Sequence, residues 1–181
     1  MFTSLKNAQG IVDIFQENPN KYMPSLTLAQ QILREPANLS SAERELIAAF
    51  TSSLNKCNYC ADSHTAFAES LGVDSKELQN VLNQNYKEHR LSAVFDYVKK
   101  LTLNPSSLTP TDFNSVIDSG ITEEELKDAI AVCAAFNYFN RIVEGHFLPT
   151  HPEGAKGFAQ VAEMITKHGY DRRGANGLGQ A

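Results

Sequence analysis

Two cysteines, a histidine and a glutamate are the side chains in this 181-residue sequence whose types and spacing could do chemistry. Cys57 and Cys60 stand at C-x-x-C spacing, and His64 follows four residues after the second cysteine. Glu45 precedes the first cysteine by twelve residues. A thiol is a nucleophile only as its thiolate, and a free cysteine with a pKa of about 8.5 is mostly protonated at neutral pH. Thiol chemistry at this pair therefore needs features that stabilise the thiolate.

Three features of the sequence would lower the pKa of these thiols. The pair stands at the first turn of a helix predicted from about Asn58 to Ser70, where unpaired backbone N–H groups and the helix dipole favour negative charge. The C-x-x-C spacing lets one sulfur hydrogen-bond to the thiolate of the other. His64 lies one helical turn after Cys60 on the same face, close enough to accept or donate a proton.

The helix before the cysteines decides whether Glu45 can reach them. Ser40 and Glu43 form the pattern of a capping box, which predicts the start of this helix, and residues 55–56 mark its end. On one continuous helix Glu45 would lie about 18 Å from Cys57. A reversal of the chain at residues 55–56 would instead give two antiparallel helices.

In such a helix hairpin Glu45 and His64 could face each other, about 13 Å and about 10 Å below the turn at a rise of about 1.5 Å per residue. Glu45 would then orient His64, and His64 would serve Cys60. A base held by an orienting group is the usual arrangement beside an activated nucleophile. By this reasoning Cys60, rather than Cys57, receives the direct help.

The remainder of the chain predicts more helices. No stretch alternates convincingly at a period of two residues, so the expected fold class is all-α, a compact multi-helix bundle. We expect one domain over residues 1–168, followed by a flexible Gly-rich tail over residues 169–181. The other helices are expected within residues 8–34 (two short helices with a break near Asn18 to Asn20), from Asp74 to about Leu82, around Leu91 to Leu101, from Thr109-Pro110 onward, from Thr122 through a long apolar segment, and from about Glu153 to Lys167.

The bulk composition argues against several other classes of protein. Hydrophobic residues make up 42% and charged residues 20%, as in ordinary soluble globular domains. The net charge of −5, with no cluster of Lys or Arg, argues against a nucleic-acid partner. No apolar run approaches the roughly twenty residues of a membrane span, and the N-terminus lacks the pattern of a secretory signal. We therefore expect a cytoplasmic protein without a disulfide scaffold.

The pattern of Glu45, eleven residues, Cys57, two residues, Cys60, three residues and His64 resembles the signature of the alkylhydroperoxidase D (AhpD) family. That family belongs to the carboxymuconolactone decarboxylase-like superfamily. The sequence AERELIAAFTSSLNKCNYCADSH is most similar to the peroxidase-related branch. The motif covers about Ser40 to Gly72, and the predicted helical layout extends the resemblance over most of the chain.

The resemblance implies an all-α homo-oligomer, a trimer or hexamer, that acts as an antioxidant peroxidase on small hydroperoxides and needs a dithiol or thioredoxin-like reductant. By position it makes Cys60 the peroxidatic cysteine and Cys57 the resolving one, with Glu45 and His64 as the proton relay. We expect neither a cofactor nor a metal ion. The sequence departs from the family at Tyr59, where the best-known members carry a second histidine just before the second cysteine.

Other interpretations of the same residues stay open. The cysteines and His64 could be half of a zinc site, although structural zinc needs four ligands and no second pair is evident. The cysteines could also be two small buried hydrophobic residues. A lactone decarboxylase or related acid–base enzyme could share the fold without needing the cysteine pair. A redox sensor or electron relay could use the pair to exchange disulfides with another protein.

Four residues of the longest predicted helix need a separate interpretation. Cys133 stands alone in an apolar segment and is expected in the core. Asn137, Asn140 and Arg141 interrupt this buried helix and need hydrogen-bonding partners. We favour a structural role for them, while contacts with a neighbouring subunit or a place in the pocket opposite the cysteines are alternatives.

Overall fold

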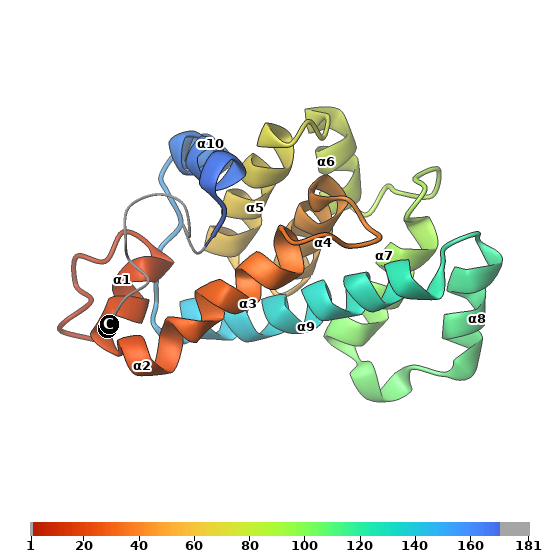
Figure 1. Ribbon diagram of the computed structural model, residues 1–181, viewed down its shortest axis with the longest axis horizontal. Coiled ribbons are helices and arrows are strands. Elements are labelled where there is room, and N and C mark those ends of the chain that lie inside the picture. Colours follow the sequence, from red (N-terminus) through yellow and green to blue (C-terminus); the bar gives the residue numbers. More distant parts are fainter. Residues whose placement is uncertain (1, 171–181) are drawn as a thin grey trace.

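The structure is a computed structural model that describes residues 2–170, and within them it contains helices and no strand (Figure 1). This confirms the predicted all-α class. The helices are α1 (Ile11–Glu17), α2 (Pro19–Tyr22), α3 (Pro24–Leu33), α4 (Ser41–Leu54), α5 (Asn58–Ser70), α6 (Ser75–Leu82), α7 (Ser92–Leu103), α8 (Pro110–Asp118), α9 (Glu123–Gly145) and α10 (Ala159–His168), with short 3-10 helices η1 (Pro105–Ser107) and η2 (Gly154–Phe158).

The predicted hairpin of two antiparallel helices is formed by α4 and α5. Ser40 and Glu43 make the expected capping box, in which the Ser40 hydroxyl accepts the backbone N–H of Glu43 and the Glu43 carboxylate accepts that of Ser40. α4 ends at Leu54, and α5 has the bounds that the sequence predicted. The chain therefore reverses at residues 55–56, and one face of α4 is brought against one face of α5.

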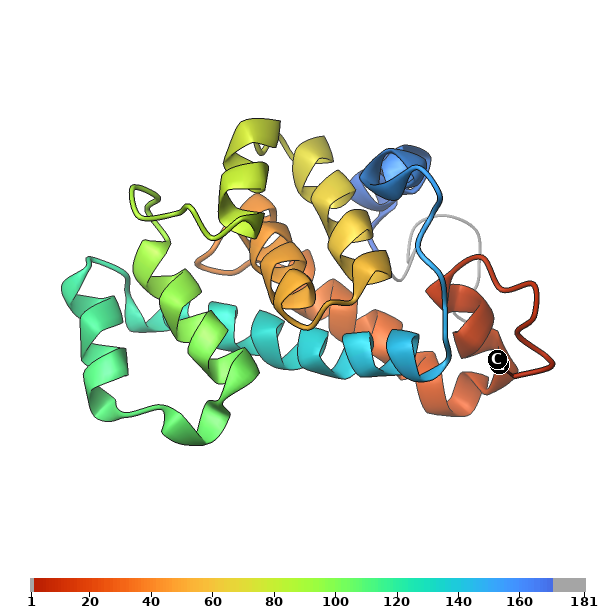
Figure 2. The ribbon, with the colours of Figure 1, turned by 180° about the vertical axis from the view of Figure 1, so that it is seen from behind.

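α9 is the long helix against which the hairpin is packed, and Figure 2 shows the hairpin turn beside it. Residues 129–140 of this helix carry no charged side chain, as expected for its buried middle. Phe136 of α9, Phe50 of α4 and Phe95 of α7 are all fully buried, and the rings of Phe50 and Phe95 lie 5.1 Å apart. The main core therefore lies between α4, α7 and α9, with α3 packed against both α4 and α9.

Helices near the two ends of the described chain, α1 and α10, cover the side of the hairpin that carries the cysteines. A second, smaller hydrophobic cluster joins Phe67 of α5 to Phe158 and Ala162 at the start of the C-terminal helix. Figure 1 shows α10 beside α5, with α1 and α2 at the same end of the molecule. Tyr170 also packs against this region. Of the tail predicted over residues 169–181, residues 171–181 lie outside the described residues, and the domain boundary stays a prediction.

Some predicted details differ from the structure. The short helix α2, which Pro19 starts, begins inside the break predicted near Asn18 to Asn20. The last helix begins as 3-10 helix η2 and becomes α-helical only at Ala159. At α6 the spacing of Asp74 and Glu77 is that of a capping box, but only Asp74 caps the helix. The Glu77 carboxylate pairs instead with His89, 2.7 Å away, and the histidine side chain is only 16% exposed.

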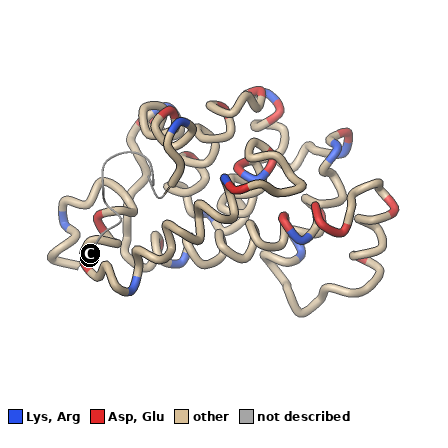
Figure 3. Tube along the Cα trace, viewed as in Figure 1, with Lys and Arg blue, Asp and Glu red and all other residues tan. Residues whose placement is uncertain are grey.

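Charged residues of both signs are interspersed over the surface in Figure 3, without a region of Lys and Arg alone. α3 and the middle of α9 carry almost no charge in the same view. Within residues 2–170, no helix is both long enough and apolar enough to cross a membrane.

Candidate active site

The turn between α4 and α5 places both cysteines at the start of a helix. Lys56 adopts the left-handed conformation (φ 58°), and the N–H groups of Lys56 and Cys57 donate to the carbonyls of Ser53 and Ser52. This is the bonding of a Schellman motif, which closes a helix and turns the chain. Cys57 is consequently the N-cap of α5, and Cys60 lies in its first turn. Unpaired N–H groups and the helix dipole favour a thiolate there.

The two cysteines of the pair are free thiols that lie 3.5 Å apart. Cys57 is completely buried, whereas Cys60 is 3% exposed and lines a cavity. The hydrogen bond with Cys60 and, after it, burial raise the pKa of Cys57. Cys57 is therefore a protonated thiol, and Cys60 is the sulfur that faces the cavity.

Glu45 and His64 face each other across the hairpin, as the reversal of the chain predicted. His64 Nδ1 lies 2.5 Å from Glu45 Oε2, and both side chains are buried. Because a carboxylate can only accept hydrogen bonds, Nδ1 carries a proton, and in the neutral ring Nε2 keeps its lone pair. The pair thus has the form of a base held by an orienting carboxylate.

The other carboxylate oxygen of Glu45 also has partners. Oε1 lies 2.6 Å from Arg34 Nη1 and accepts a hydrogen bond from the Tyr170 hydroxyl at 2.6 Å. Burial opposes the charged form and raises the pKa of this carboxyl. The contacts with His64, Arg34 and Tyr170 together outweigh burial, so that the pKa of Glu45 is lowered and the group stays ionised.

Aromatic rings enclose the His64 imidazole. The rings of Phe136 and Phe67 meet it edge-on with centroids 4.4 Å and 4.9 Å away, and the Tyr170 ring stacks at 6.3 Å. These contacts fix the plane of the imidazole and keep water from one side of it. His64 is therefore held by packing as well as by its hydrogen bond to Glu45.

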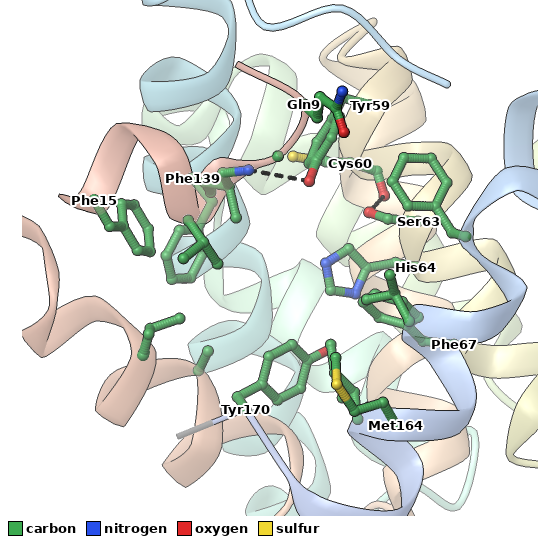
Figure 4. A pocket seen from close by; sticks show the side chains of 18 of the residues that line it. Gln9, Phe15, Tyr59, Cys60, Ser63, His64, Phe67, Phe139, Met164 and Tyr170 are labelled. Atoms are coloured by element: carbon green, nitrogen blue, oxygen red, sulfur yellow. Dashed lines mark hydrogen bonds between the residues drawn. The ribbon is translucent and has the colours of Figure 1, made fainter. Parts of the chain in front are cut away.

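A cavity of about 710 Å³ opens in front of Cys60 and His64. Figure 4 shows both side chains, with Tyr59 and Tyr170, at its wall. The volume lies within the range of about 300–1,000 Å³ that is usual for small-molecule sites. Its lining is mainly apolar and comes from α1, α2, α3, α5, α9, η2, α10 and the loops beside them. It contains no Lys, Arg, Asp or Glu among the described residues. Cys57 is not part of the lining.

Tyr59, which stands where the resembling family has a histidine, has a different contact. Its hydroxyl accepts the backbone N–H of Ile11 at 3.1 Å, and its ring meets that of Phe158 edge-on at 5.2 Å. Burial raises the pKa of Tyr59 to about 12, so this hydroxyl is uncharged at neutral pH. Tyr59 therefore fastens α1 and η2 over the cavity.

The polar residues of α9 hold the hairpin turn. Asn55 Nδ2 donates to the side-chain oxygens of Asn137 and Asn140, at 3.2 Å and 2.9 Å. Asn140 Nδ2 donates to Ser52 Oγ at 3.0 Å, and Arg141 contacts Asn137. None of the three polar residues of α9 lines the cavity. Their structural role, which we favoured from the sequence, is therefore to bind the end of α4 to α9.

The third cysteine, Cys133, lies outside the cavity lining. Cys133 is completely buried beside Thr102, and burial raises its pKa. It therefore belongs to the core, as predicted. Within the part of the chain that the structure describes, no three His, Cys, Asp or Glu side chains are grouped so that they could hold a metal ion.

Arg34 and Tyr170 were missed by the sequence analysis. Arg34 follows the apolar end of α3, where a charged residue usually marks a solvated helix end, and Tyr170 fell in the predicted tail. The signals that could have found them are weak: a lone cation after a buried leucine, and one aromatic residue in a Gly-rich segment. Their contact with Glu45 depends on tertiary structure alone.

Comparisons with known proteins agree with this fold. Residues 25–94 match the sequence model of the carboxymuconolactone decarboxylase family. The chain is 25% identical over 109 residues to the uncharacterized protein YdfG of Bacillus subtilis, which covers 59% of this chain and 74% of YdfG. The fold is similar to an uncharacterized peroxidase-related protein from a Silicibacter species, with a TM-score of 0.73, 23% identity and coverage of 80% of this chain and 78% of that chain.

A similar structure from Ralstonia eutropha is described as an alkylhydroperoxidase AhpD core, an uncharacterized peroxidase-related protein. It has a TM-score of 0.74 and 21% identity, and the likeness covers 84% of this chain and 80% of that one. The fold is thus the all-α AhpD-like fold. The family match thus covers residues 25–94, and the similarity in fold extends over most of the chain.

Proposed function

We propose that this protein is a thiol-dependent peroxidase that reduces hydroperoxides through a dithiol–disulfide cycle of Cys57 and Cys60. One observation carries the proposal: Cys60 faces an apolar cavity, has Cys57 3.5 Å behind it, and shares the cavity wall with His64. Glu45, buried against His64, completes the set of groups that the chemistry needs. The match of residues 25–94 to the carboxymuconolactone decarboxylase family and the similarity in fold to peroxidase-related proteins support the proposal.

Each residue has a defined part in the reaction. His64 Nε2 takes the proton of the Cys60 thiol, and the thiolate attacks the terminal oxygen of the hydroperoxide. The O–O bond breaks, the alcohol leaves with the proton from His64, and Cys60 becomes a sulfenic acid. The Cys57 thiol then attacks the Cys60 sulfur, water leaves, and the disulfide forms. A dithiol or thioredoxin-like reductant returns two electrons and two protons.

The cavity supports an uncharged organic hydroperoxide as the substrate. Hydrogen peroxide would leave most of its about 710 Å³ unfilled. A carboxylate on the substrate would find no Lys or Arg among the described lining residues to offset its desolvation. Apolar walls such as Phe15, Phe139 and Met164 instead favour a bulky alkyl or aromatic group. Cytoplasmic location and assembly as a trimer or hexamer belong to the same proposal.

The second candidate function is acid–base catalysis, as in a lactone decarboxylase. It is favoured by the family match. It is also favoured because His64, oriented by the Glu45 carboxylate, could act as a general base beside the cavity without the cysteines. It predicts that activity survives the loss of both thiols. The peroxidase predicts the opposite, so cysteine variants separate the two.

The test is peroxide consumption with a dithiol reductant, using cumene hydroperoxide as the probe. Cys60→Ser should abolish both consumption and sulfenic-acid labelling. Cys57→Ser should stop turnover yet trap a sulfenic acid on Cys60 after one equivalent of peroxide. Cys133→Ser, in which a buried thiol outside the site changes, is the matched control and should behave as the wild type.

Three results would change the conclusion. A sulfenic acid trapped on Cys57 in Cys60→Ser would exchange the roles of the two sulfurs and keep the peroxidase. Unchanged consumption in both variants would overturn the peroxidase. If the wild type consumes no peroxide but its disulfide still exchanges with a partner protein, a redox relay replaces the peroxidase.

A further inference from the structure

The Oε1 atom of Glu45 is bound by two groups that the proposed proton relay does not use. Arg34 reaches it from the end of α3, and Tyr170 reaches it from the segment after α10, each at 2.6 Å. The Tyr170 ring also lies against the Arg34 guanidinium, with 4.9 Å between its centroid and Cζ. Tyr170 thus contacts both members of the Arg34–Glu45 ion pair.

Further contacts hold Tyr170 and Arg34 in these positions. The backbone N–H of Tyr170 donates to Gln30 Oε1 at 2.9 Å, and the Tyr170 ring stacks on the His64 ring with an interplanar angle of 18°. Arg34 Nη1 also donates to the Leu33 carbonyl at 2.9 Å. Burial and the neighbouring carboxylate raise the pKa of Tyr170 well above its usual value, so its hydroxyl stays a hydrogen-bond donor.

The charges around Glu45 can be counted from the elements packed against it. Glu45 is completely buried, and the side chains of Arg34 from α3 and His64 from α5 are each 9% exposed. Tyr170 is uncharged. Arg44, the next cation on α4, also interacts with the charge of Glu45, but it donates to the carbonyl of Ile32 and is offset by the carboxylate of Asp128. α9 contributes the uncharged ring of Phe136, which contacts His64.

This count fixes the proton number at which the site is electrically neutral. With Arg34 present, Glu45 as carboxylate and His64 as neutral imidazole sum to zero. Without Arg34, the same buried pair is neutral only when it binds one more proton. Because uncompensated charge is costly in a buried site, Arg34 favours the state in which the Glu45–His64 pair has not bound the additional proton.

We propose that Arg34 and Tyr170 are positioning residues that hold Glu45 as a carboxylate with Oε2 directed at His64, so that His64 rests as the neutral Nδ1–H form with Nε2 free. Arg34 supplies the balancing charge and Tyr170 the second donor on Oε1. The inference rests on the proposed function in one respect: the free Nε2 is the atom that takes the Cys60 proton. The protonation state itself can be measured without any peroxide.

The test is the titration of the Glu45–His64 pair, followed by NMR through the His64 ring signals, which are assigned by their absence in His64→Gln. In the wild type the neutral ring should show a protonated Nδ1 and an unprotonated Nε2. Arg34→Met should raise the titration midpoint by at least about one pH unit, a tenfold gain in proton affinity. Tyr170→Phe should raise it by about 0.5–1 unit, because one hydrogen bond to the carboxylate is lost.

A conservative variant and two controls separate positioning from general damage. Arg34→Lys restores the charge and should return the midpoint to within about 0.5 unit of the wild type. Arg90→Met and Tyr138→Phe remove the same side-chain types from the surface pair with Glu43 and from the contact with Ser25. Both should leave the midpoint unchanged.

The inference is overturned if Arg34→Met folds and titrates at the wild-type midpoint, or if neutral His64 carries its proton on Nε2. Should Arg34→Met fail to fold, Tyr170→Phe decides alone, because it removes a single oxygen atom; an unshifted midpoint then overturns the inference. Shifted midpoints in a wild type that consumes no peroxide would keep the inference and refute the peroxidase. Peroxide turnover with unshifted midpoints would do the reverse.

Discussion

Replacing Glu45 with glutamine should destabilise the fold, because the change leaves the buried Arg34 guanidinium without its counter-charge. It should also stop the proposed peroxidase reaction, because His64 loses the carboxylate that orients it. The Arg34 side chain is 9% exposed, and the Glu45 side chain is completely buried. Removing one partner of a buried ion pair costs about 3–5 kcal/mol. At about 2–4 °C per kcal/mol for a domain of this size, the melting temperature should fall by about 6–20 °C.

A double-mutant cycle measured by urea unfolding tests this magnitude. Glu45→Gln combined with Arg34→Met removes both charges, so the free energy of unfolding should fall by at least about 2 kcal/mol less than the sum of the two single changes. The matched control is the pair of Glu43 and Arg90, in which the Arg90 side chain is 50% exposed. Its coupling should be about 0–1 kcal/mol. Additive losses at the buried pair would refute the reasoning.

The buried pair also gives stability a defined pH dependence. The pKa of Glu45 is lowered from 4.5 in the fold, so its contribution to the free energy of unfolding is complete above pH 4.5 and is lost as the pH falls through the lowered pKa. Glu45→Gln lacks this contribution at every pH. The difference in stability between the wild type and the variant should therefore narrow below pH 4.5, and a constant difference would contradict the lowered pKa.

Further predictions concern the hairpin turn, the cavity wall, the cysteine pair and the oligomeric state. Lys56→Gly should stabilise the fold by about 0.5–1 kcal/mol, because residue 56 adopts φ of 58°; a loss of stability in thermal unfolding would contradict the hairpin turn described above. Met164→Trp should narrow the cavity and raise KM for cumene hydroperoxide by at least about tenfold, with little change for hydrogen peroxide. After mild oxidation, mass spectrometry should find a Cys57–Cys60 disulfide and reduced Cys133; a bridge to Cys133 as the main product would exclude the proposed cycle. Sedimentation at micromolar concentration should find a trimer or hexamer, and a stable monomer would contradict assembly.

The helix hairpin could be predicted from the sequence because its determinants are local. Capping residues such as Ser40 and Glu43 act within one helical turn, and the pairing of Glu45 with His64 follows once the chain reverses at residues 55–56. The bounds of α5 were predicted correctly for the same reason. Helix ends, caps and residue spacing depend on residues that are close together in the chain, so they can be predicted from the sequence alone.

The surroundings of the hairpin could not be predicted because they depend on segments far apart in the chain. Tyr170 reaches Glu45 across 125 positions, and Asn140 reaches Asn55 across 85. A polar residue in a buried helix predicts that a partner exists, but not which one. The same limit applies to Glu77. Its spacing from Asp74 is that of a capping box, but in the folded chain its carboxylate pairs with His89 instead.

The residues proposed to react and many of the residues that line the cavity lie in different parts of the sequence. The four proposed catalytic residues lie between Glu45 and His64, inside the segment 25–94 that matches the superfamily. Much of the cavity wall, including Phe139 and Met164, lies outside that segment. If the proposed function is correct, the matched segment supplies the thiol chemistry, and selectivity for the hydroperoxide is set largely by residues that the match does not reach. Substitutions in the cavity wall should consequently change which peroxide is reduced while leaving thiol reactivity intact.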